Sequence, residues 1–471
     1  MFAENLLARK AILLSSRRVL LKRLLQAGST GSFGLGTLTS CTAPKQSPIT
    51  ISWITNVDHW NTFKNLATYF SKINQAAITV NAIPRTDYDT LVGLFEKQDT
   101  TYDLVSLDVT WMREFITKNW LVSLDDYWPE NDAQLKRSDY LQTPLKICCW
   151  NEQLWAAPLH TDVGILYYRT RDRQNNPIPL YNANELTWED LARMAQQAQE
   201  SHGFSGGFLW EGYWSTSQRA KEGLMCLFLE ILDGFDGQLF DSADNPQKVL
   251  INSTQAINAL EHMRKWNTTI SEYITDKRQK KKASDNNDSD CAKVWKNGEA
   301  VFMRNWPSFI TDSDNAKNAV AEKYDIAPLP QRVLTSAGQQ SAGTTRSCLG
   351  GWQLAINRYS PKSHQDAAWQ FIKWMLSAEV QQYLASNESF AVTLESVYND
   401  PYINALNPHY KLLPQIIKNA QYRPLLPNYL QRVAIPVQRI VSRVLTDDGY
   451  TPQQAVQDLQ LQLEKALQKK V

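Results

Sequence analysis

Short apolar runs alternate with helically spaced apolar positions through the first part of the chain. Alternation of apolar and polar residues predicts strands, whereas apolar residues three and four positions apart predict helices that bury one face. In chain order, the pattern predicts strands over 49–54, 77–83 and 102–108, with helices over 63–73 and 88–95 between them. Strand and helix in strict alternation predict a doubly wound α/β unit.

The strand over 102–108 ends in Asp108, and Trp111 follows shortly after it. Ligands of doubly wound sheets bind outside the carboxyl ends of the strands, so both residues are expected at a crevice. Asp108 is also a candidate helix cap, because residues 109–116 have a helical pattern and Asp is a favoured capping residue. The two roles do not exclude each other.

A later strand, residues 349–357, carries Gly350, Gly351 and Trp352 directly after Leu349. Paired glycines let a ligand approach the main chain closely, and an indole offers a flat apolar face. An ordinary turn into a core strand is the alternative. The helical pattern from Ser360 to Leu376 follows, which gives strand, turn and amphipathic helix in that order.

Composition narrows the classes of partner. The chain of 471 residues is long enough for two or more sizeable domains. It carries 49 basic and 48 acidic side chains, a net charge of +1, so no nucleic-acid partner is expected, and a basic run over 277–282 is balanced by the acidic residues that follow it. The 16 Trp residues suit a site that stacks on flat apolar faces, although a Trp-rich core is the alternative.

The six cysteines indicate no metal or redox site. Cys41 lies near the amino terminus, and no pair among the other five has the spacing of a zinc knuckle or a redox dithiol. Buried free thiols are expected, with a bridge from Cys226 to Cys291 or Cys348 left open. No cofactor is expected either, and HExxH, P-loop and GxSxG patterns are absent.

The segment from Gly350 to Trp374 resembles the extracellular solute-binding proteins of ABC importers, in particular those that bind trehalose, maltose and related sugars. The resemblance covers most of the chain after residue 49. It extends to four further segments: 155–169, 206–210 with Glu222–Gly223–Leu224, the Met-Arg-Asn-Trp-Pro motif at 303–307, and the Arg-Pro segment at 423–429. Residues 212–220 look inserted relative to the family pattern, and Lys221 stands where an aromatic is usual.

The resemblance implies a periplasmic-binding-protein-like α/β fold of two doubly wound lobes joined by a hinge with three crossings, the class II type. Lobe 1 would comprise residues 49–160 and 330–396, and lobe 2 residues 161–329 and 397–471. The crossings are expected at about Pro158 to Gly164, at 329–351 and near Val397.

The same resemblance assigns the site. Asp162 becomes a hinge carboxylate that accepts sugar hydroxyls, with Gly164 relieving crowding beside it. Trp306 becomes a stacking platform, and Arg423 offers a planar fork to hydroxyls. The complete set of expected sugar-binding residues is Arg85, Asp108, Trp111, Asp162, Trp306, Gly350, Gly351, Trp352 and Arg423, of which Arg85 and Trp111 match by neighbourhood only.

The amino terminus resembles a twin-arginine export signal that ends in a lipobox. Arg17 and Arg18 precede a weakly apolar, Gly- and Ser-rich stretch, and Leu38-Thr-Ser leads to Cys41. Residues 1–40 would be the signal and 41–48 a tether. Cys41 would be lipidated and would anchor the protein to the outer face of the plasma membrane, in the periplasm or its equivalent.

The sequence therefore predicts a monomeric, non-enzymatic lipoprotein that captures a di- or oligosaccharide, or a sugar osmolyte such as glucosylglycerol, for the membrane permease subunits of an ABC importer. A glycoside hydrolase with Asp108 and Asp162 as paired carboxylates is the alternative. A sugar-sensing receptor partner would use the same cleft.

Overall fold

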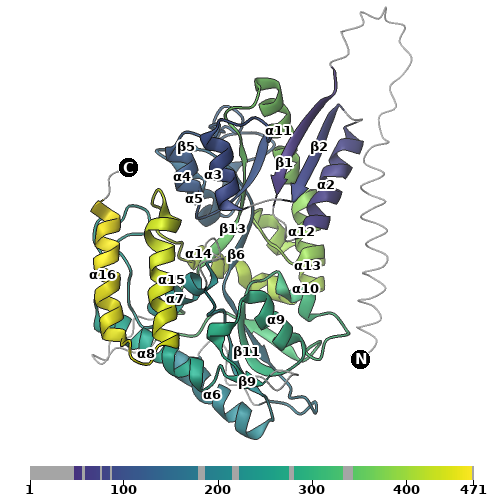
Figure 1. The fold of residues 1–471 in the computed structure, drawn as a ribbon. Helices are drawn as coiled ribbons and strands as arrows, with labels where there is room; N and C mark the ends of the chain where they lie inside the picture. Colours follow the sequence, from purple (N-terminus) through teal and green to yellow (C-terminus); the bar gives the residue numbers. More distant parts are fainter. Residues whose placement is uncertain are drawn as a thin grey trace, which may run out of the picture.

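The computed structural model describes residues 47–55, 59–74, 77–84, 87–178, 186–214, 222–274, 280–332 and 343–468. Cys41, Arg85 and most of the apparent insertion at 212–221 lie outside these ranges. The described chain forms two lobes, each built on one sheet, and strands β6 and β13 run between them at the centre of the molecule (Figure 1). No helix within the described ranges combines the length and the apolar character needed to cross a bilayer.

Lobe 1 is built on a six-stranded sheet in the order β14-β6-β13-β3-β1-β2. Its strands are β1 (Ile49–Thr55), β2 (Ile78–Pro84), β3 (Leu104–Asp108), β6 (Ala157–Val163), β13 (Leu349–Ile356) and β14 (Ala391–Val392). Strand β1 pairs in parallel with β2 and β3, as the alternation of strands and helices predicts. Strand β13 is antiparallel to both β3 and β6, so the sheet is mixed.

The helices of lobe 1 bury their apolar faces against this sheet. They are α2 (Trp60–Ile73), α3 (Tyr88–Glu96), α4 (Met112–Thr117), α5 (Gln142–Ile147), α11 (Lys362–Met375) and α12 (Ala378–Glu388). The predicted apolar stripe of α2 is buried at Phe63, Leu66 and Phe70. Phe70 and Phe371 meet edge to face with ring centroids 5.0 Å apart, which joins α2 to α11.

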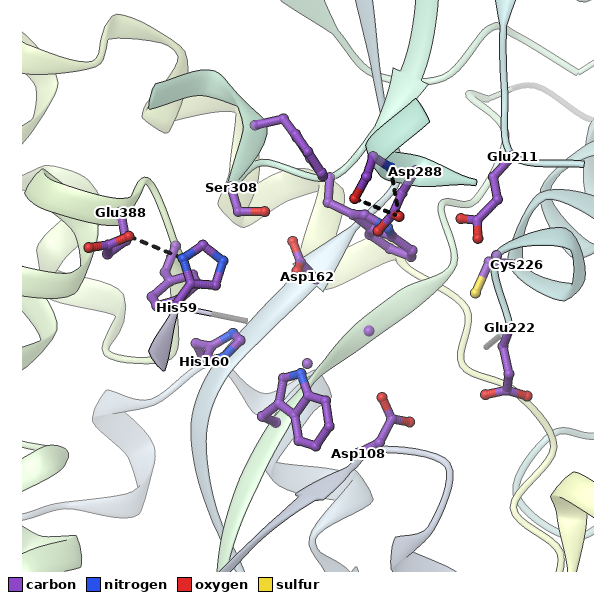
Figure 2. A pocket seen from close by; sticks show the side chains of 18 of the residues that line it. His59, Asp108, His160, Asp162, Glu211, Glu222, Cys226, Asp288, Ser308 and Glu388 are labelled. Carbon is purple, nitrogen blue, oxygen red and sulfur yellow. Dashed lines mark hydrogen bonds and ion pairs between the residues drawn. The ribbon is translucent and has the colours of Figure 1, made fainter. Parts of the chain in front are cut away.

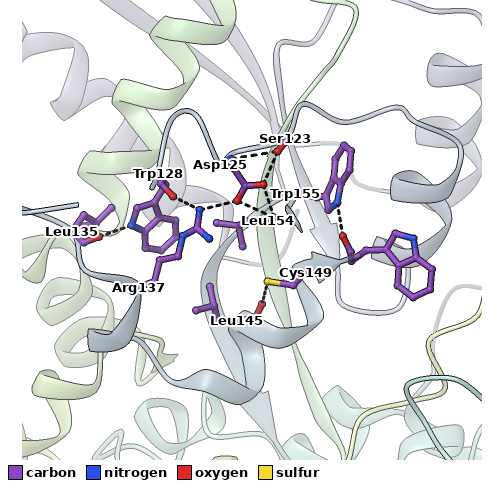
Figure 3. A network of polar contacts seen from close by, with 10 residues as sticks. Ser123, Asp125, Trp128, Leu135, Arg137, Leu145, Cys149, Leu154 and Trp155 are labelled. Carbon is purple, nitrogen blue, oxygen red and sulfur yellow. Dashed lines mark hydrogen bonds and ion pairs between the residues drawn. The ribbon is translucent and has the colours of Figure 1, made fainter. Parts of the chain in front are cut away.

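A polar network fixes the segment that leads into β6 (Figure 3). Asp125 pairs with Arg137 at 2.9 Å, and its carboxylate also accepts from Leu154 N. Arg137 donates to the main chain of Trp128 as well. The network ties the short hairpin of β4 (Cys149–Trp150) and β5 (Gln153–Leu154) to the body of lobe 1, so β6 starts from a fixed point.

Lobe 2 is built on a four-stranded mixed sheet in the order β12-β7-β11-β8. The strands are β7 (Ile165–Arg169), β8 (Gly206–Leu209), β11 (Ala300–Asn305) and β12 (Tyr324–Ala327), and a separate ladder joins β9 (Tyr273–Ile274) to β10 (Lys280–Lys281). The helices are α6 (Trp188–Ser201), α7 (Gly223–Gly234), α8 (Thr254–Thr268), α9 (Asp288–Lys296), α10 (Phe309–Ser313), α15 (Ile435–Thr446) and α16 (Pro452–Gln468). Thr451 and Gln454 form a capping box that starts α16.

Three stretches connect the lobes. Gly164 alone separates β6 of the first sheet from β7 of the second, and the chain returns between β12 and β13. The third passage comes later than Val397. Helix α13 (Pro401–Leu406) packs on α12, and α14 (Leu413–Asn419) still contacts α5 and β6 of lobe 1. The chain joins lobe 2 only after Gln421, which bridges to Cys348, and Leu425 N then bonds Ala243 O. Helices α13 and α14 therefore contact lobe 1, whereas the boundary expected from sequence places them in lobe 2. The other lobe boundaries stay a prediction.

The five cysteines of the described chain are free thiols. Cys148, Cys226, Cys291 and Cys348 are buried, and Cys149 is half-buried. Burial raises the pKa of Cys148 and Cys291, which keeps these thiols protonated and unreactive.

Candidate functional site

A cleft of about 540 Å³ lies between the two lobes at β6 and β13, a size typical of small-molecule sites (Figure 2). Its lining comes from both lobes and from the strands between them. The lining residues are His59, Asp108, His160, Asp162, Glu211, Glu222, Gly223, Cys226, Asp288, Ser289, Trp306, Ser308, Phe309, Gly350, Gly351, Trp352, Glu388, Phe390 and Arg423.

Sheet register brings the predicted residues of three strands together. Gly350 on β13 lies opposite Asp162 on β6. Trp352 lies opposite Asp108 on β3 and, on its other side, opposite His160 on β6. Asp108 on β3 and Asp162 on β6 are 54 positions apart in the sequence. They line the same cleft because both strands pair with β13.

The two glycines of β13 are required by close packing. Gly351 has a φ of 124°, and a Cβ there would lie 2.5 Å from His160 O. A Cβ on Gly350 would lie 3.2 Å from the Cβ of Asp162 and 3.5 Å from Cζ3 of Trp306. The glycines therefore let β13 pass close to β6 and leave room for Asp162 and Trp306 to meet beside it.

Trp306 lies at the end of β11, on the lobe 2 wall of the cleft. The Arg304 guanidinium stacks on its ring with 4.0 Å between the guanidinium carbon and the ring centroid, and its carbonyl accepts a 2.6 Å hydrogen bond from Tyr167. Arg304 is itself buried in a bidentate pair with Glu230, at 2.6 and 2.7 Å. Gly164 passes this pair so closely that a Cβ would overlap it, which fits the expected role of Gly164 in relieving crowding.

Trp352 is the aromatic residue on the lobe 1 side, and it is half-buried. Trp111 meets it edge to face, with ring centroids 5.6 Å apart. Trp111 is only 5% exposed and does not line the cleft, contrary to the expectation from sequence. It supports Trp352 from behind, because the turn after β3 directs its ring into the lobe 1 core.

Asp108 holds the turn between β3 and α4 and also faces the cleft. Its Oδ1 accepts from the main-chain N and the hydroxyl of Thr110, at 2.9 and 2.7 Å. The same oxygen lies 3.9 Å from Nη2 of Arg423. Asp108 is not the N-cap of α4, contrary to the expectation from sequence, because the helix begins only at Met112 with Trp111 as its N-cap. Its carboxylate fixes the turn before the helix and lines the cleft.

Arg423 is buried between the lobes. Its guanidinium donates to Cys226 Sγ on α7 at 3.0 Å and to Leu349 O at 3.1 Å, and Nη1 lies 3.4 Å from Glu222 Oε2. These contacts fix the Arg423 guanidinium group at the edge of the cleft nearest α7. Burial raises the pKa of Glu222 to about 7, with Arg423 opposing the shift.

Asp162 lies at the centre of the cleft, where β6 leaves lobe 1 (Figure 2). Burial raises its pKa to about 7, against the opposing effects of His59 and Arg304. The carboxyl group can therefore donate or accept a hydrogen bond near neutral pH.

Sequence reasoning missed the end of the cleft formed by His59, His160, Glu388 and Phe390. His160 stacks on Phe390 with centroids 4.3 Å apart, and burial lowers its pKa to about 3, so the imidazole is neutral. His59 contacts Glu388 at 3.1 Å. His160 could have been found, because it stands two positions before Asp162 on a strand and shares its face.

Glu211, Glu222 and Asp288 were also missed as lining residues. Asp288 and Glu211 lie at the first turns of α9 and α7: Asp288 begins α9, and a Cβ on Gly223 would overlap the Glu211 carboxylate. Acidic residues are favoured at helix amino termini, so the presence of Glu211 and Asp288 there did not by itself indicate a binding site.

Comparison with known proteins agrees with the fold and the cleft. Residues 58–382 match the bacterial extracellular solute-binding protein family. A probable ABC transporter-binding protein of Deinococcus radiodurans is 30% identical over 276 residues, which are 58% of this chain and 59% of that relative. Across this match the chain thus spans less than two thirds of the relative.

Two solved structures cover nearly the whole of their own chains. The maltose-bound MalE3 of T. maritima is 28% identical, with a TM-score of 0.74 over 88% of this chain and 99% of that one. The GacH receptor of Streptomyces glaucescens, solved unliganded and with acarbose, is 21% identical, with a TM-score of 0.72 over 90% and 100%. The architecture is that of class II periplasmic sugar-binding proteins.

Proposed function

The chain belongs to the family of bacterial extracellular solute-binding proteins, and we propose that it captures a di- or oligosaccharide, or a related sugar osmolyte, and delivers it to the permease subunits of an ABC importer. The observation that carries the proposal is the meeting of two indole rings, Trp306 and Trp352, with Asp108, Asp162 and Arg423 around one cleft. The likeness to the maltose-bound MalE3 supports it.

Sugars need this combination of groups. Their C–H faces stack on indole rings, while carboxylates and guanidinium groups bond the hydroxyls in charge-assisted hydrogen bonds. Asp162 would bond a hydroxyl of a sugar ring stacked on Trp306; the closeness of both residues to Gly350 supports this. Asp108 and Arg423 would bond the hydroxyls at the side of the cleft nearest α7.

Binding would close the two lobes about the stretches that join them. A ligand that touches Asp108 from lobe 1 and Trp306 from lobe 2 gains contacts in the closed form that the open form lacks, and such differential contacts shift the population. The expected location is the outer face of the plasma membrane, with Cys41 as the lipid-bearing residue.

The test is a panel of trehalose, maltose, sucrose, glucosylglycerol and longer glucans, measured by calorimetry and thermal shift on the purified mature protein. Saturable binding of at least one of them supports the proposal, and its absence across the panel contradicts it. Release of labelled monosaccharide from bound disaccharide would instead support the glycoside hydrolase alternative, for which the raised pKa of Asp162 would suit a general acid.

A further inference from the structure

The lining of the cleft is rich in carboxyl groups. Of the described residues that line it, six are carboxylates and one is a guanidinium: Asp108, Asp162, Glu211, Glu222, Asp288 and Glu388 against Arg423. His160 adds no positive charge because burial lowers its pKa to about 3. Burial raises the pKa of two of these carboxyl groups, Asp162 and Glu222, to about 7, so each is shared between its neutral and charged forms near neutral pH. A cation beside them would favour the charged form.

Four of these carboxylates are already held by the protein. Glu388 contacts His59 and Thr62, and Asp108 accepts from Thr110. Asp288 accepts from Ser289 N at 2.7 Å in the first turn of α9, and Glu211 lies against the start of α7. Their roles in turns and at helix ends account for them without any ligand.

Asp162 and Glu222 are different. Among the described residues, the Asp162 carboxylate has no hydrogen bond or ion pair. Glu222 is 8% exposed, and its Oε1 is buried without a hydrogen-bond partner in the described chain. Its other oxygen lies 3.4 Å from Nη1 of Arg423, a guanidinium that also faces Asp108 and donates to Cys226 and Leu349. Tyr429 and Thr110 also lie near this carboxyl group. Within the described chain, the Asp162 carboxyl group at the centre of the cleft and one oxygen of Glu222 at its α7 edge therefore lack a hydrogen-bond partner.

A metal ion is not indicated, because the described residues contain no group of three or more side chains arranged to hold one. An organic cation fits the surroundings better. Asp162 and Trp306 lie against the same glycine, so a carboxylate and an indole ring border one space. An ammonium group there would gain a charge-assisted hydrogen bond to Asp162. It would also lie against the indole ring of Trp306, on which the Arg304 guanidinium already stacks.

We propose that the ligand of this cleft is a sugar that carries a protonated amine, bound with its ammonium group against Asp162 and Trp306 and within reach of the charge of Glu222. The inference rests on the sugar-binding function proposed above and narrows its substrate class from neutral sugars to amino sugars.

Matched pairs of sugars test it. Calorimetry on the mature protein at pH 7.5 compares trehalose with 6-amino-6-deoxytrehalose and with 2-amino-2-deoxytrehalose, and maltose with the same two amino derivatives. At least one amine is expected to bind about tenfold more tightly than its parent, the size expected for one charge-assisted hydrogen bond. In Asp162→Asn, which keeps the side-chain shape, the preference should fall below about threefold because the charge is lost.

Two controls make the result decisive. Asp366→Asn removes an exposed carboxylate on α11 that pairs with Lys362, far from the cleft lining, and should leave the amine preference unchanged. Glu222→Gln should reduce the preference without abolishing it. Equal affinity of every amine and its parent overturns the amino-sugar inference while leaving sugar binding intact, whereas failure of all the sugars, parents included, overturns the proposed function itself.

Discussion

Arg423 and Asp108 face each other across the cleft, with 3.9 Å between Nη2 and Oδ1. Asp108 belongs to β3 of lobe 1, whereas Arg423 lies on the last stretch of chain before lobe 2 and is bonded to α7 through Cys226. The pair therefore joins the two lobes directly, at a place where a ligand can contact both partners.

Arg423→Gln should uncouple the lobes. Without the guanidinium, Glu222 and Asp108 repel each other, and sugar affinity should fall by roughly tenfold or more as a charge-assisted contact is lost. In small-angle scattering, saturating sugar should reduce the radius of gyration of the wild type but much less that of the variant. Arg193→Gln, at an exposed pair with Asp190, is the matched control. Full compaction of Arg423→Gln at saturation would refute the role of this residue in closure.

Trp306→Ala and Trp352→Ala should each weaken sugar binding by about 1–3 kcal/mol, on the scale known for bases stacked on aromatic side chains. Both rings line the cleft, so stability should change less than affinity. Trp111→Ala should do the reverse, because its ring is buried behind Trp352. Calorimetry and thermal melts separate the two outcomes. An unchanged affinity in both cleft variants would assign these rings to the core.

Gly351→Ala should be strongly destabilising. Its φ of 124° is unfavourable for any side chain, and the new Cβ would lie 2.5 Å from His160 O. Gly93→Ala is the control, since nothing lies within 4 Å of a Cβ in the helix α3, where alanine should stabilise by about 0.5–1 kcal/mol. Denaturant unfolding should therefore shift in opposite directions for the two variants, and a wild-type midpoint for Gly351→Ala would contradict the packing described.

Stability should depend on pH through Asp162. Its pKa is raised from 3.8 to about 7, so the folded state binds more protons than the unfolded state between these values, and the contribution of this group to stability falls as pH rises from 4 to 7. His160 acts oppositely: its pKa is lowered from 6.5 to about 3, so its contribution is present above pH 6.5 and is lost on acidification.

The difference between wild type and Asp162→Asn isolates the first effect. The gain in unfolding free energy on replacing Asp162 should increase from pH 4.5 to pH 7.5, whereas Asp447→Asn, at an exposed carboxylate, should show no such increase. A gain independent of pH would mean that the Asp162 carboxyl titrates as in the unfolded chain.

Cys41 should carry the lipid anchor. Metabolic labelling with palmitate in the native host should label the wild type and leave Cys41→Ala unlabelled. The reason is that the acyl chains of a lipoprotein are attached to the cysteine of its lipobox. Equal labelling of both proteins would reject the assignment.

Local patterns in the sequence determined the elements and much of the cleft. Alternation and helical spacing predicted β1, α2, β2, α3 and β3, since the side-chain period of each element is set by the backbone itself. Gly350, Gly351 and Trp352 could be named because paired glycines and an indole stand where a strand begins. Asp162 and Trp306 could be named only because their segments resemble those of a known family.

The tertiary structure alone decided the rest. His59 and Glu388 meet although more than 300 positions separate them, and no local signal marks either one. Trp111 and Trp352 are both aromatic residues next to a strand, yet only Trp352 reaches the cleft, because the turn after Asp108 directs Trp111 inward. The excess of carboxylates also became visible only when β3, β6, α7 and α9 were brought together, since charge that is balanced along the chain need not be balanced within a cavity.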